Sequence, residues 1–431
     1  MSLLSTLACL TLTATTTGPL LTLEQALATA HERQPSLHQA QAEVAAADAR
    51  ARQALATLLP QVSANAQYSR TTANFAGRPG SVPSNLGTAA QSASFDTFSY
   101  FNFGLGVNQL IYDFGSWDKK AAAERLADAS RSSHAATAVQ VALAVRTAYF
   151  EARAARALVR VAEETVANQS RHLEQARAFV EVGTRPEIDL AQARTDLANA
   201  QVQRINALNG YATAKAVLNQ AMGINGVADF DVADESMAPV EGEALDGDAL
   251  LAIALEARPE LAALSAQLEA QARSTDGIRG AYWPRLSAST SFSEAGTALN
   301  AMAWNWDIGL ALSWALFEGG RTRAQVAEAD ANLAAQRAQL DALKLDVRVE
   351  VERARLGVLA AKAALEAAAD ATDAARARLR LAEGRYETGV GNIIELSDAQ
   401  VALTTAEAQA IQAEYNLATA RATLMKALGR A

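Results

Sequence analysis

The stretch Trp304-Asn305-Trp306-Asp307-Ile308-Gly309-Leu310-Ala311-Leu312-Ser313-Trp314-Ala315-Leu316 alternates between large apolar residues and small or polar ones. A period of two predicts a β-strand with one apolar and one polar face. Tryptophan on the apolar face suits a lipid–water boundary, because indole combines an apolar ring with a polar N–H group. The length of about 12 residues fits a tilted strand that crosses a bilayer. A half-buried strand of an ordinary sheet would show the same pattern.

Three further segments alternate in the same way, at residues 60–70, 101–112 and 284–293. The four segments predict two hairpins in a chain that is otherwise helical. Open sheet edges are not tolerated in lipid, and membrane barrels need about eight strands or more. If these strands meet lipid, several copies of the chain must share one barrel. The aromatic residues expected to face the membrane are Trp304, Trp306, Trp314, Phe101, Phe103, Tyr68 and Phe292.

The composition excludes several classes of protein. A net charge of -9 argues against a nucleic-acid partner. The single cysteine excludes an internal disulfide or a cysteine-based zinc site. The sequence has no Gly-rich phosphate loop, no nucleophile with a paired base and no metal-ligand cluster, so we expect no enzyme activity, cofactor or metal.

The first 20 residues have the apolar character of an export signal, but they lack a basic start and a clean cleavage site. Cys9 is a candidate for lipid attachment, and the alternative is a cysteine in a discarded apolar segment. No run of 18 or more apolar residues occurs, so no helix is expected to span a membrane.

The chain reads as one unit used twice. The interval from proline to proline is 25 residues in both halves, from Pro35 to Pro60 and from Pro259 to Pro284. An acidic connector, residues 224–248, joins the halves. The first repeat, 21–223, is expected to contain helices over 21–59 with a break at Pro35, strands 60–70 and 101–112, a long helix 116–181 and a return helix 187–222. The second, 249–431, is expected to contain helix 249–283, strands 284–293 and 304–316, a long helix 321–388 and a return helix 393–428.

The first hairpin has 19 more residues than the second, in the loop Thr71 to Asp96. Long loops on one side of a membrane barrel usually face the cell exterior. This loop is therefore expected to be exposed there.

The duplicated order of short helix, hairpin, very long helix, glycine turn and return helix resembles the TolC-like outer-membrane efflux ducts over residues 21–429. Two local stretches are similar as well, residues 21–27 (LTLEQAL) and 386–389 (YETG). The resemblance implies a mainly α fold with a β-barrel portion. Four strands from each of three chains would form a 12-stranded barrel in the outer membrane, and long helical hairpins would form a periplasmic α-barrel with an equatorial collar.

The same resemblance implies the function. Such a duct carries substrates from a periplasmic adaptor and an inner-membrane pump, of RND, ABC or MFS type, to the cell exterior, and is gated at its periplasmic end. The sequence does not identify the cargo or the class of pump.

Glu395 and Asp398 lie three residues apart on one helical face. The resemblance implies that this acidic pair lines the closed aperture, and we expect it to make the pore cation-selective. Two ordinary solvated charges are the alternative. Tyr386 and Asp189 match two of three residues that tie the family's closed state. Gly391 stands at the position of the third, an arginine, which predicts a weaker lock with Arg185 as a candidate substitute.

The resemblance also implies adaptor-docking tips at the two glycine turns, Val182, Gly183, Thr184, Thr388, Gly389 and Val390. The alternative is that these glycines simply end helices. A soluble, alanine-rich helical scaffold or coiled-coil interaction protein is the competing function. The aromatic, alternating hairpins favour the duct.

Overall fold

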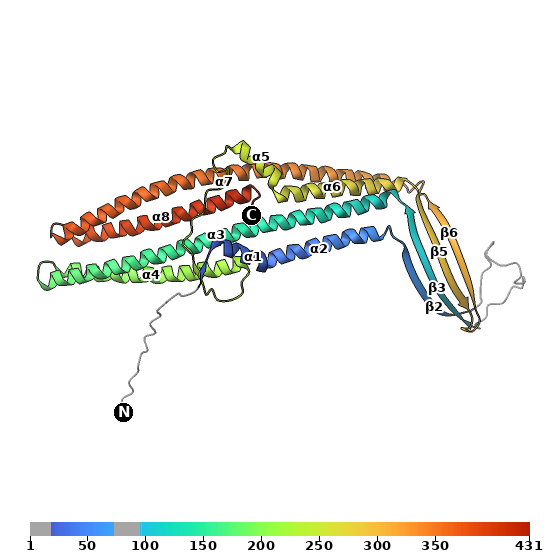
Figure 1. Cartoon of the computed structure of the whole chain (residues 1–431), viewed down its shortest axis with the longest axis horizontal. Helices are drawn as coiled ribbons and strands as arrows, with labels where there is room; N and C mark the ends of the chain where they lie inside the picture. The colour runs from blue at the N-terminus through green and yellow to red at the C-terminus, as the bar shows by residue number, and fades with distance from the viewer. Residues whose placement is uncertain (1–18, 73–94, 96) are drawn as a thin grey trace, which may run out of the picture. The chain divides into compact units, whose positions relative to one another are not determined.

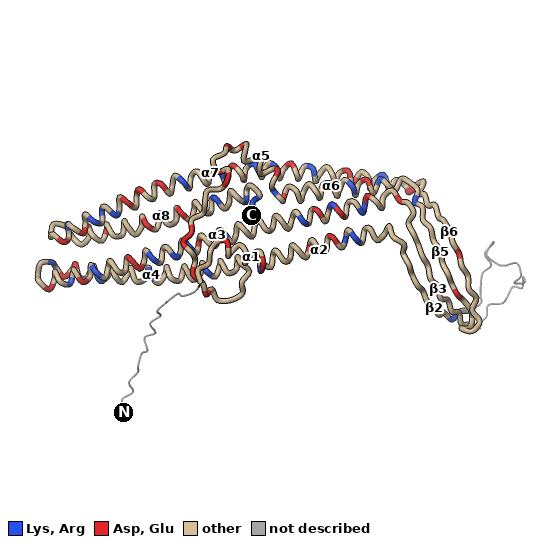
Figure 2. The backbone as a smooth tube through the Cα atoms, in the orientation of Figure 1, with Lys and Arg blue, Asp and Glu red and all other residues tan. Residues whose placement is uncertain are grey.

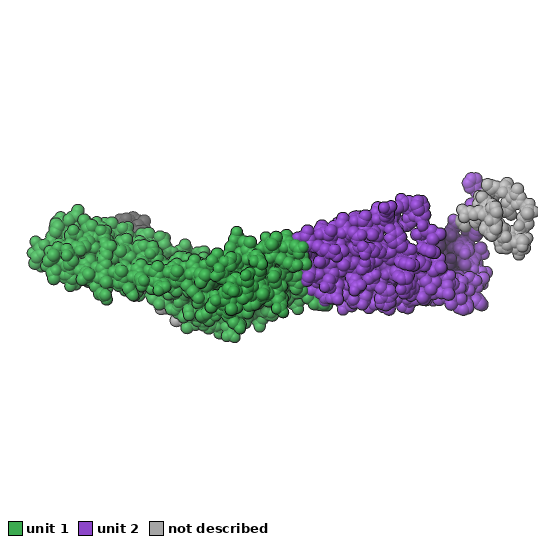
Figure 3. Space-filling model, turned by 90° about the horizontal axis from the view of Figure 1, so that it is seen from above, with its two compact units in different colours: residues 1–43, 130–263, 340–431 green, residues 44–129, 264–339 purple. Residues whose placement is uncertain are grey.

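The computed structural model describes residues 19–72, 95 and 97–431. Cys9, most of the predicted export signal and most of the predicted exposed loop lie outside these residues. The chain divides into two compact units (Figure 3). Unit 1 comprises residues 1–43, 130–263 and 340–431, and unit 2 comprises residues 44–129 and 264–339.

The described chain is mainly helical (Figure 1). Its helices are α1 (Leu23–Arg33), α2 (Pro35–Ala56), α3 (Phe114–Glu181), α4 (Glu187–Met222), α5 (Gly247–Ala257), α6 (Pro259–Arg279), the 3-10 turn η1 (Gly280–Tyr282), α7 (Arg321–Glu387) and α8 (Ile393–Ala427). None of the described helices has an apolar stretch long enough to cross a membrane. The strands are β1 (Leu20–Leu21), β2 (Gln61–Thr72), β3 (Thr97–Tyr112), β4 (Asp231–Val232), β5 (Arg285–Gly296) and β6 (Met302–Ser313).

Pro35 and Pro259 each begin a helix directly after a break from the preceding helix. Gln34 and Arg258 are both extended, with ψ of 117° and 121°. The residue before proline disfavours the helical conformation, and proline is well suited to the first turn of the next helix. The predicted helical segment 249–283 is therefore divided into α5 and α6 before Pro259, as the corresponding segment of the first repeat is divided before Pro35. The first helix also begins later than predicted, at Leu23, because Thr22 and Gln25 form a capping box.

The long strands of unit 2 form one antiparallel sheet in the order β2-β3-β5-β6. Residues that are opposite in the register share a face, so Leu105, Phe292 and Trp306 lie on one face. Asn65, Gly104 and Asn305 lie on the other. The four strands carry few charged residues, namely Arg70, Arg285, Glu294 and Asp307 (Figure 2). The predicted division into an apolar and a polar face is present.

The strand ends differ from the prediction. β3 begins four residues earlier, at Thr97, where it pairs with Thr72, and β5 continues to Gly296. β6 ends at Ser313, opposite Arg285, so Trp314 lies outside the strand although it continues the alternation. Proline precedes Arg285 and has no N–H group to extend the ladder.

The duplication is visible at the ends of the return helices. Gly223 follows α4 with φ of +74°, and Gly429 follows α8 with φ of +73°. A Cβ atom on Gly223 would lie 2.6 Å from the carbonyl oxygen of Arg33, and one on Gly429 would lie 2.8 Å from that of Ala257. Each glycine therefore lets a return helix end directly against the C-terminus of the short helix of its own repeat.

The connector, residues 224–248, is held by hydrogen bonds and ion pairs. β4 pairs in parallel with β1. Further along, Glu243 binds Lys362 at 2.6 Å and Arg421 at 3.1 Å. Burial alone would raise the pKa of Glu243, but the hydrogen bonds from these two cations and from the N–H group of Val240 bring its pKa below the ordinary value. The acidic residue is therefore charged and fastens the connector to α7 and α8.

We expect Gly223→Ala to destabilise the protein, whereas Gly210→Ala, within α4, stabilises it. Alanine at residue 223 costs about 1–2 kcal/mol for its left-handed conformation, and about 1–3 kcal/mol more for overpacking. A Cβ atom at residue 210 meets nothing within 4 Å, and alanine is favoured over glycine inside a helix by roughly 0.5–1 kcal/mol. Thermal unfolding of both variants by circular dichroism measures the difference. Equal unfolding temperatures would contradict this packing.

Candidate functional site

Two glycine turns join the paired helices of unit 1, residues 182–186 between α3 and α4 and residues 388–392 between α7 and α8 (Figure 1). Gly183 has φ of +76° and Gly389 has φ of +82°. A Cβ atom on either glycine would meet nothing within 4 Å, so glycine serves the backbone conformation here. All six predicted docking residues are exposed, with Val182 at 78% and Val390 at 72%.

Arg185 joins one turn to the other. Its guanidinium group donates hydrogen bonds to the carbonyl oxygens of Gly391 at 2.9 Å and Tyr386 at 3.2 Å. The guanidinium carbon also lies 4.7 Å from the centre of the Tyr386 ring. A Cβ atom on Gly391 would meet atoms of Arg385 and Tyr386 at 3.0–3.1 Å, which leaves little room for a side chain. The arginine that joins the turns is therefore Arg185 of the first turn, the candidate substitute named from the sequence, and not a residue at position 391.

Tyr386 and Asp189 are both buried at this junction. The Tyr386 ring packs edge-on against Phe179, with the ring centres 6.0 Å apart. Its hydroxyl group makes no hydrogen bond of good geometry among the described residues, although it is near enough to the carboxylate of Asp189 to interact with it. Burial, followed by the negative charge of Asp189, raises the pKa of Tyr386.

The predicted acidic pair lies in the first two turns of α8. Asn392 caps this helix by accepting a hydrogen bond from the N–H group of Glu395. The carboxylate of Glu395 pairs with Arg385 of α7 at 3.1 Å. Asp398 is exposed. Within one chain, Glu395 is therefore half-buried and paired with a cation, whereas the side chain of Asp398 is exposed to solvent.

The apolar face of the sheet in unit 2 is uncovered. Trp304, Trp306, Ile308 and Leu310 are 60–75% exposed. Phe103, Tyr68 and Phe292 are also exposed, whereas Phe101 is partly buried against Tyr68. Trp314 is exposed but lies one residue beyond β6, where its indole N–H group donates to the carbonyl oxygen of Tyr282. In a protein surrounded by water, such a continuous apolar surface would normally be covered by other parts of the protein.

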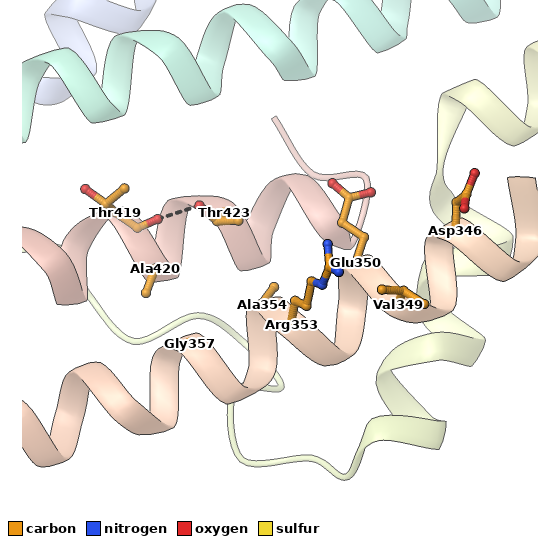
Figure 4. Close-up of a pocket in the computed structure, with 9 residues that line it drawn as sticks. All are labelled: Asp346, Val349, Glu350, Arg353, Ala354, Gly357, Thr419, Ala420 and Thr423. Atoms are coloured by element: carbon orange, nitrogen blue, oxygen red, sulfur yellow. Dashed lines mark hydrogen bonds between the residues drawn. The ribbon is translucent and has the colours of Figure 1, made fainter.

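A hollow of 680 Å³ lies along α7 and α8 in unit 1 (Figure 4). Small residues such as Ala354, Gly357 and Ala420 line part of it. The carboxylate of Glu350, on its wall, is bound by Arg258 at 2.6 Å and by Lys426. Glu350 on the wall is therefore already paired, and the small residues leave room for a closely packed helix.

An uncovered apolar face on an antiparallel sheet, joined in one chain to two long helical hairpins, defines an outer-membrane channel with helical extensions. The sequence model of the family described as "outer membrane efflux protein" matches residues 26–224 and 250–430. The chain belongs to this family, and it is an outer-membrane channel for efflux. The predicted resemblance, fold class and location are confirmed. The family's members are channels rather than enzymes, and the matches do not support the soluble scaffold.

Named relatives and a solved structure agree with this assignment. The chain is 25% identical to the outer membrane efflux protein BepC of Brucella suis, over 76% of the chain and 72% of BepC. It is 28% identical to the toluene efflux pump outer membrane protein TtgF of Pseudomonas putida, over 81% of the chain and 72% of TtgF. The fold matches the crystal structure of VceC from Vibrio cholerae, with a TM-score of 0.78, 19% identity, and coverage of 95% and 96%.

Sequence reasoning missed two features of the site. The ion pair of Glu395 with Arg385 crosses a turn, so helical periodicity gives no sign of it. The buried Gln400 and its polar neighbours were also not predicted. These polar residues lie on the buried face of α8, where apolar residues are usual, so the hydrophobic pattern gave no sign of them.

We expect Tyr386→Phe to leave stability at pH 7 unchanged or to raise it by up to about 1–3 kcal/mol, because a buried hydroxyl group without a good hydrogen bond disfavours the folded state. Above pH 10 the stability of the variant rises relative to that of the wild type. An unfolded tyrosine ionises near pH 10, but the raised pKa of Tyr386 keeps the proton on the folded protein. The free energy of unfolding of the wild type therefore falls as the pH rises past 10. Urea unfolding from pH 8 to 11, with the exposed Tyr282→Phe as control, measures this. Identical pH dependence in wild type and Tyr386→Phe would contradict it.

Proposed function

We propose that three copies of this chain form one closed duct, with their sheets joined edge to edge in the outer membrane. The observation that carries this is the sheet itself, which has an uncovered apolar face and two unpaired edges, β2 and β6. Three copies of four strands give a barrel of 12, which is above the minimum of about eight. The polar face, with residues such as Asn65, Ser291 and Asn305, then lines a hydrated lumen.

The helical hairpins of the three copies then pack side by side as a periplasmic cylinder. Small residues along α7 and α8, including Ala354 and Gly357, support close packing of a neighbouring helix. The connector, residues 224–248, forms the collar around this cylinder. Several of its charged residues are paired with helices of the same chain, as Glu243 is with Lys362 and Arg421 and Asp231 is with Arg156.

The periplasmic entrance lies at the two glycine turns. In a trimer, Glu395 and Asp398 form two rings of three carboxylates, and Tyr386, Asp189 and Arg185 hold the turns together. Arg185 supplies the charge-assisted link that Gly391 does not.

The exposed turn residues 182–184 and 388–390 dock a periplasmic adaptor, which connects the duct to an inner-membrane pump of the RND, ABC or MFS type. The names of related efflux proteins mention toluene, solvents, fusaric acid and antibiotics. By that similarity, we propose small organic molecules as the cargo.

Replacing Glu395 by Gln together with Asp398 by Asn should weaken the cation preference of the pore. The preference falls by up to about tenfold, because a channel wall with one sign of charge concentrates counter-ions at least that strongly. The reversal potential in a salt gradient across a planar bilayer measures the change. The control is Glu366→Gln with Asp370→Asn, the same chemical changes at exposed positions on α7. A reversal potential equal to that of the wild type would refute the acidic aperture.

Arg185→Ala should make the entrance open more often. A hydrogen bond from a charged group contributes about 1.5–3 kcal/mol, so the loss shifts the balance of open to closed channels by roughly tenfold or more. Single-channel recordings measure the open probability. Arg194→Ala, at an exposed position of α4, is the matched control. If Arg185→Ala opens no more often than this control, the link between the turns does not hold the channel closed.

A further inference from the structure

A cavity of 170 Å³ lies where α3, α4 and α8 meet, within unit 1. Thr165, Gln169 and Gln400 lie at its buried end, and exposed residues, among them Asn199 and Thr405, lie at its mouth. Each helix contributes to its wall, for example through Thr165 of α3, Asn199 of α4 and Gln400 of α8. Nine of the eleven residues on the wall are polar, and the other two are Ala200 and Val401. A contact between helices that is this polar is unusual, because helices normally pack through apolar residues.

The wall contains buried polar atoms that lack partners. Gln400 is 3% exposed, and its side-chain oxygen has no hydrogen-bond partner among the described residues. A small hollow that shares Gln400 and Gln169 with the cavity also contains His172. The Nε2 atom of His172 likewise has no hydrogen-bond partner, and it lies 3.9 Å from the carboxylate of Glu383. Buried polar groups in folded proteins are satisfied by protein or by ordered water.

Direct hydrogen bonds between the hairpins flank the cavity. The hydroxyl oxygens of Thr165 and Thr404 lie 3.3 Å apart, between α3 and α8. The hydroxyl group of Ser397 donates to the carboxylate of Asp196 at 3.0 Å, between α8 and α4. The polar groups of the two hairpins are therefore close enough to be bridged across the space that remains.

We propose that this cavity is a water-binding site, in which ordered water molecules join the α3–α4 hairpin to α8. Its volume is several times the roughly 10–15 Å³ within which the centre of one water molecule must fit, so it holds several water molecules. A buried water molecule needs two to four polar partners. The amide oxygen of Gln400, the hydroxyl groups of Thr165 and Thr404, and the carboxylate of Asp196 provide them.

The packing of α7 against α8 is different. There Leu379, Leu396, Ala399 and Leu403 form a buried apolar cluster. Separating that cluster exposes apolar surface to water, which is unfavourable. Separating α8 from the α3–α4 hairpin at the water-binding cavity only exchanges hydrogen bonds with ordered water for hydrogen bonds with bulk water. We therefore place the separation of α8 from the α3–α4 hairpin at this cavity. This step rests on the proposed opening of the channel.

Adjacent residues of α8 test the water site. Residues 399 and 400 are both buried, at 0% and 3% exposure, but Gln400 lines the cavity and Ala399 belongs to the apolar cluster. The full chain in membranes, as Gln400→Cys or Ala399→Cys, is treated with a small, charged methanethiosulfonate. Mass spectrometry of the peptide that carries the new cysteine separates its labelling from that of Cys9. We expect labelling at residue 400 to be at least about tenfold faster, since thiol reactivity follows access to water. Equal rates at the two positions would overturn the proposal.

A second pair of variants tests the consequence for opening. Thr165→Val with Thr404→Val removes two hydroxyl groups from the cavity while keeping the shape of each side chain. The drier contact should lower the open probability by about tenfold in bilayer recordings. The control is Thr195→Val with Thr213→Val at exposed positions of α4. An unchanged open probability would overturn the role in opening. If the wild type itself conducts no ions, the proposed opening of the duct is wrong. The labelling experiment still tests the water site, because it does not depend on conduction.

Discussion

The unpaired edges of the four-stranded sheet are the constraint on which the rest of the structure depends. β2 and β6 each pair on one side only, and the apolar face that they border is uncovered. In lipid, an N–H or carbonyl group without a partner costs several kcal/mol, so such a sheet is stable only when its edges meet other strands. The chain has no further long strand among its described residues, which is why we propose other copies of the chain as the partners.

The helical hairpins meet a different requirement. In each repeat a short helix, a long helix and a return helix share a buried cluster, with Tyr149 and Leu218 in the first and Val347 and Leu424 in the second. These clusters make the repeats rigid near the connector. At the glycine turns, the hydrogen bonds of Arg185 also join the hairpins, beside the ring contact of Phe179 with Tyr386. The hydrogen bonds of Arg185 can be exchanged for hydrogen bonds with water, which suits the opening that we propose at this end.

Much of the fold could be predicted because its patterns are local. The alternation from Trp304 to Leu312 fixes a strand and its faces, and the prolines at 35 and 259 fix helix breaks through the residue before each. The end of β6 could not be predicted from its own residues, since it depends on the proline that precedes Arg285 on the neighbouring strand. The bridge from Arg185 to Gly391 joins residues 206 positions apart. The sequence could suggest Arg185 as a substitute, but not which atoms it would contact.

The pairing of β2 of one copy with β6 of the next tests the central claim most directly. Asn65→Cys on β2 is combined in turn with Asn305→Cys, Asp307→Cys and Gly309→Cys on β6, all on the polar face. Within one chain the two strands are separated by β3 and β5, a span on the order of 14 Å, whereas a disulfide requires Cα atoms within about 7 Å. After oxidation in membranes, the account predicts that at least one pair gives covalent dimers and trimers and nothing larger. Monomers alone, for all three pairs, would contradict it.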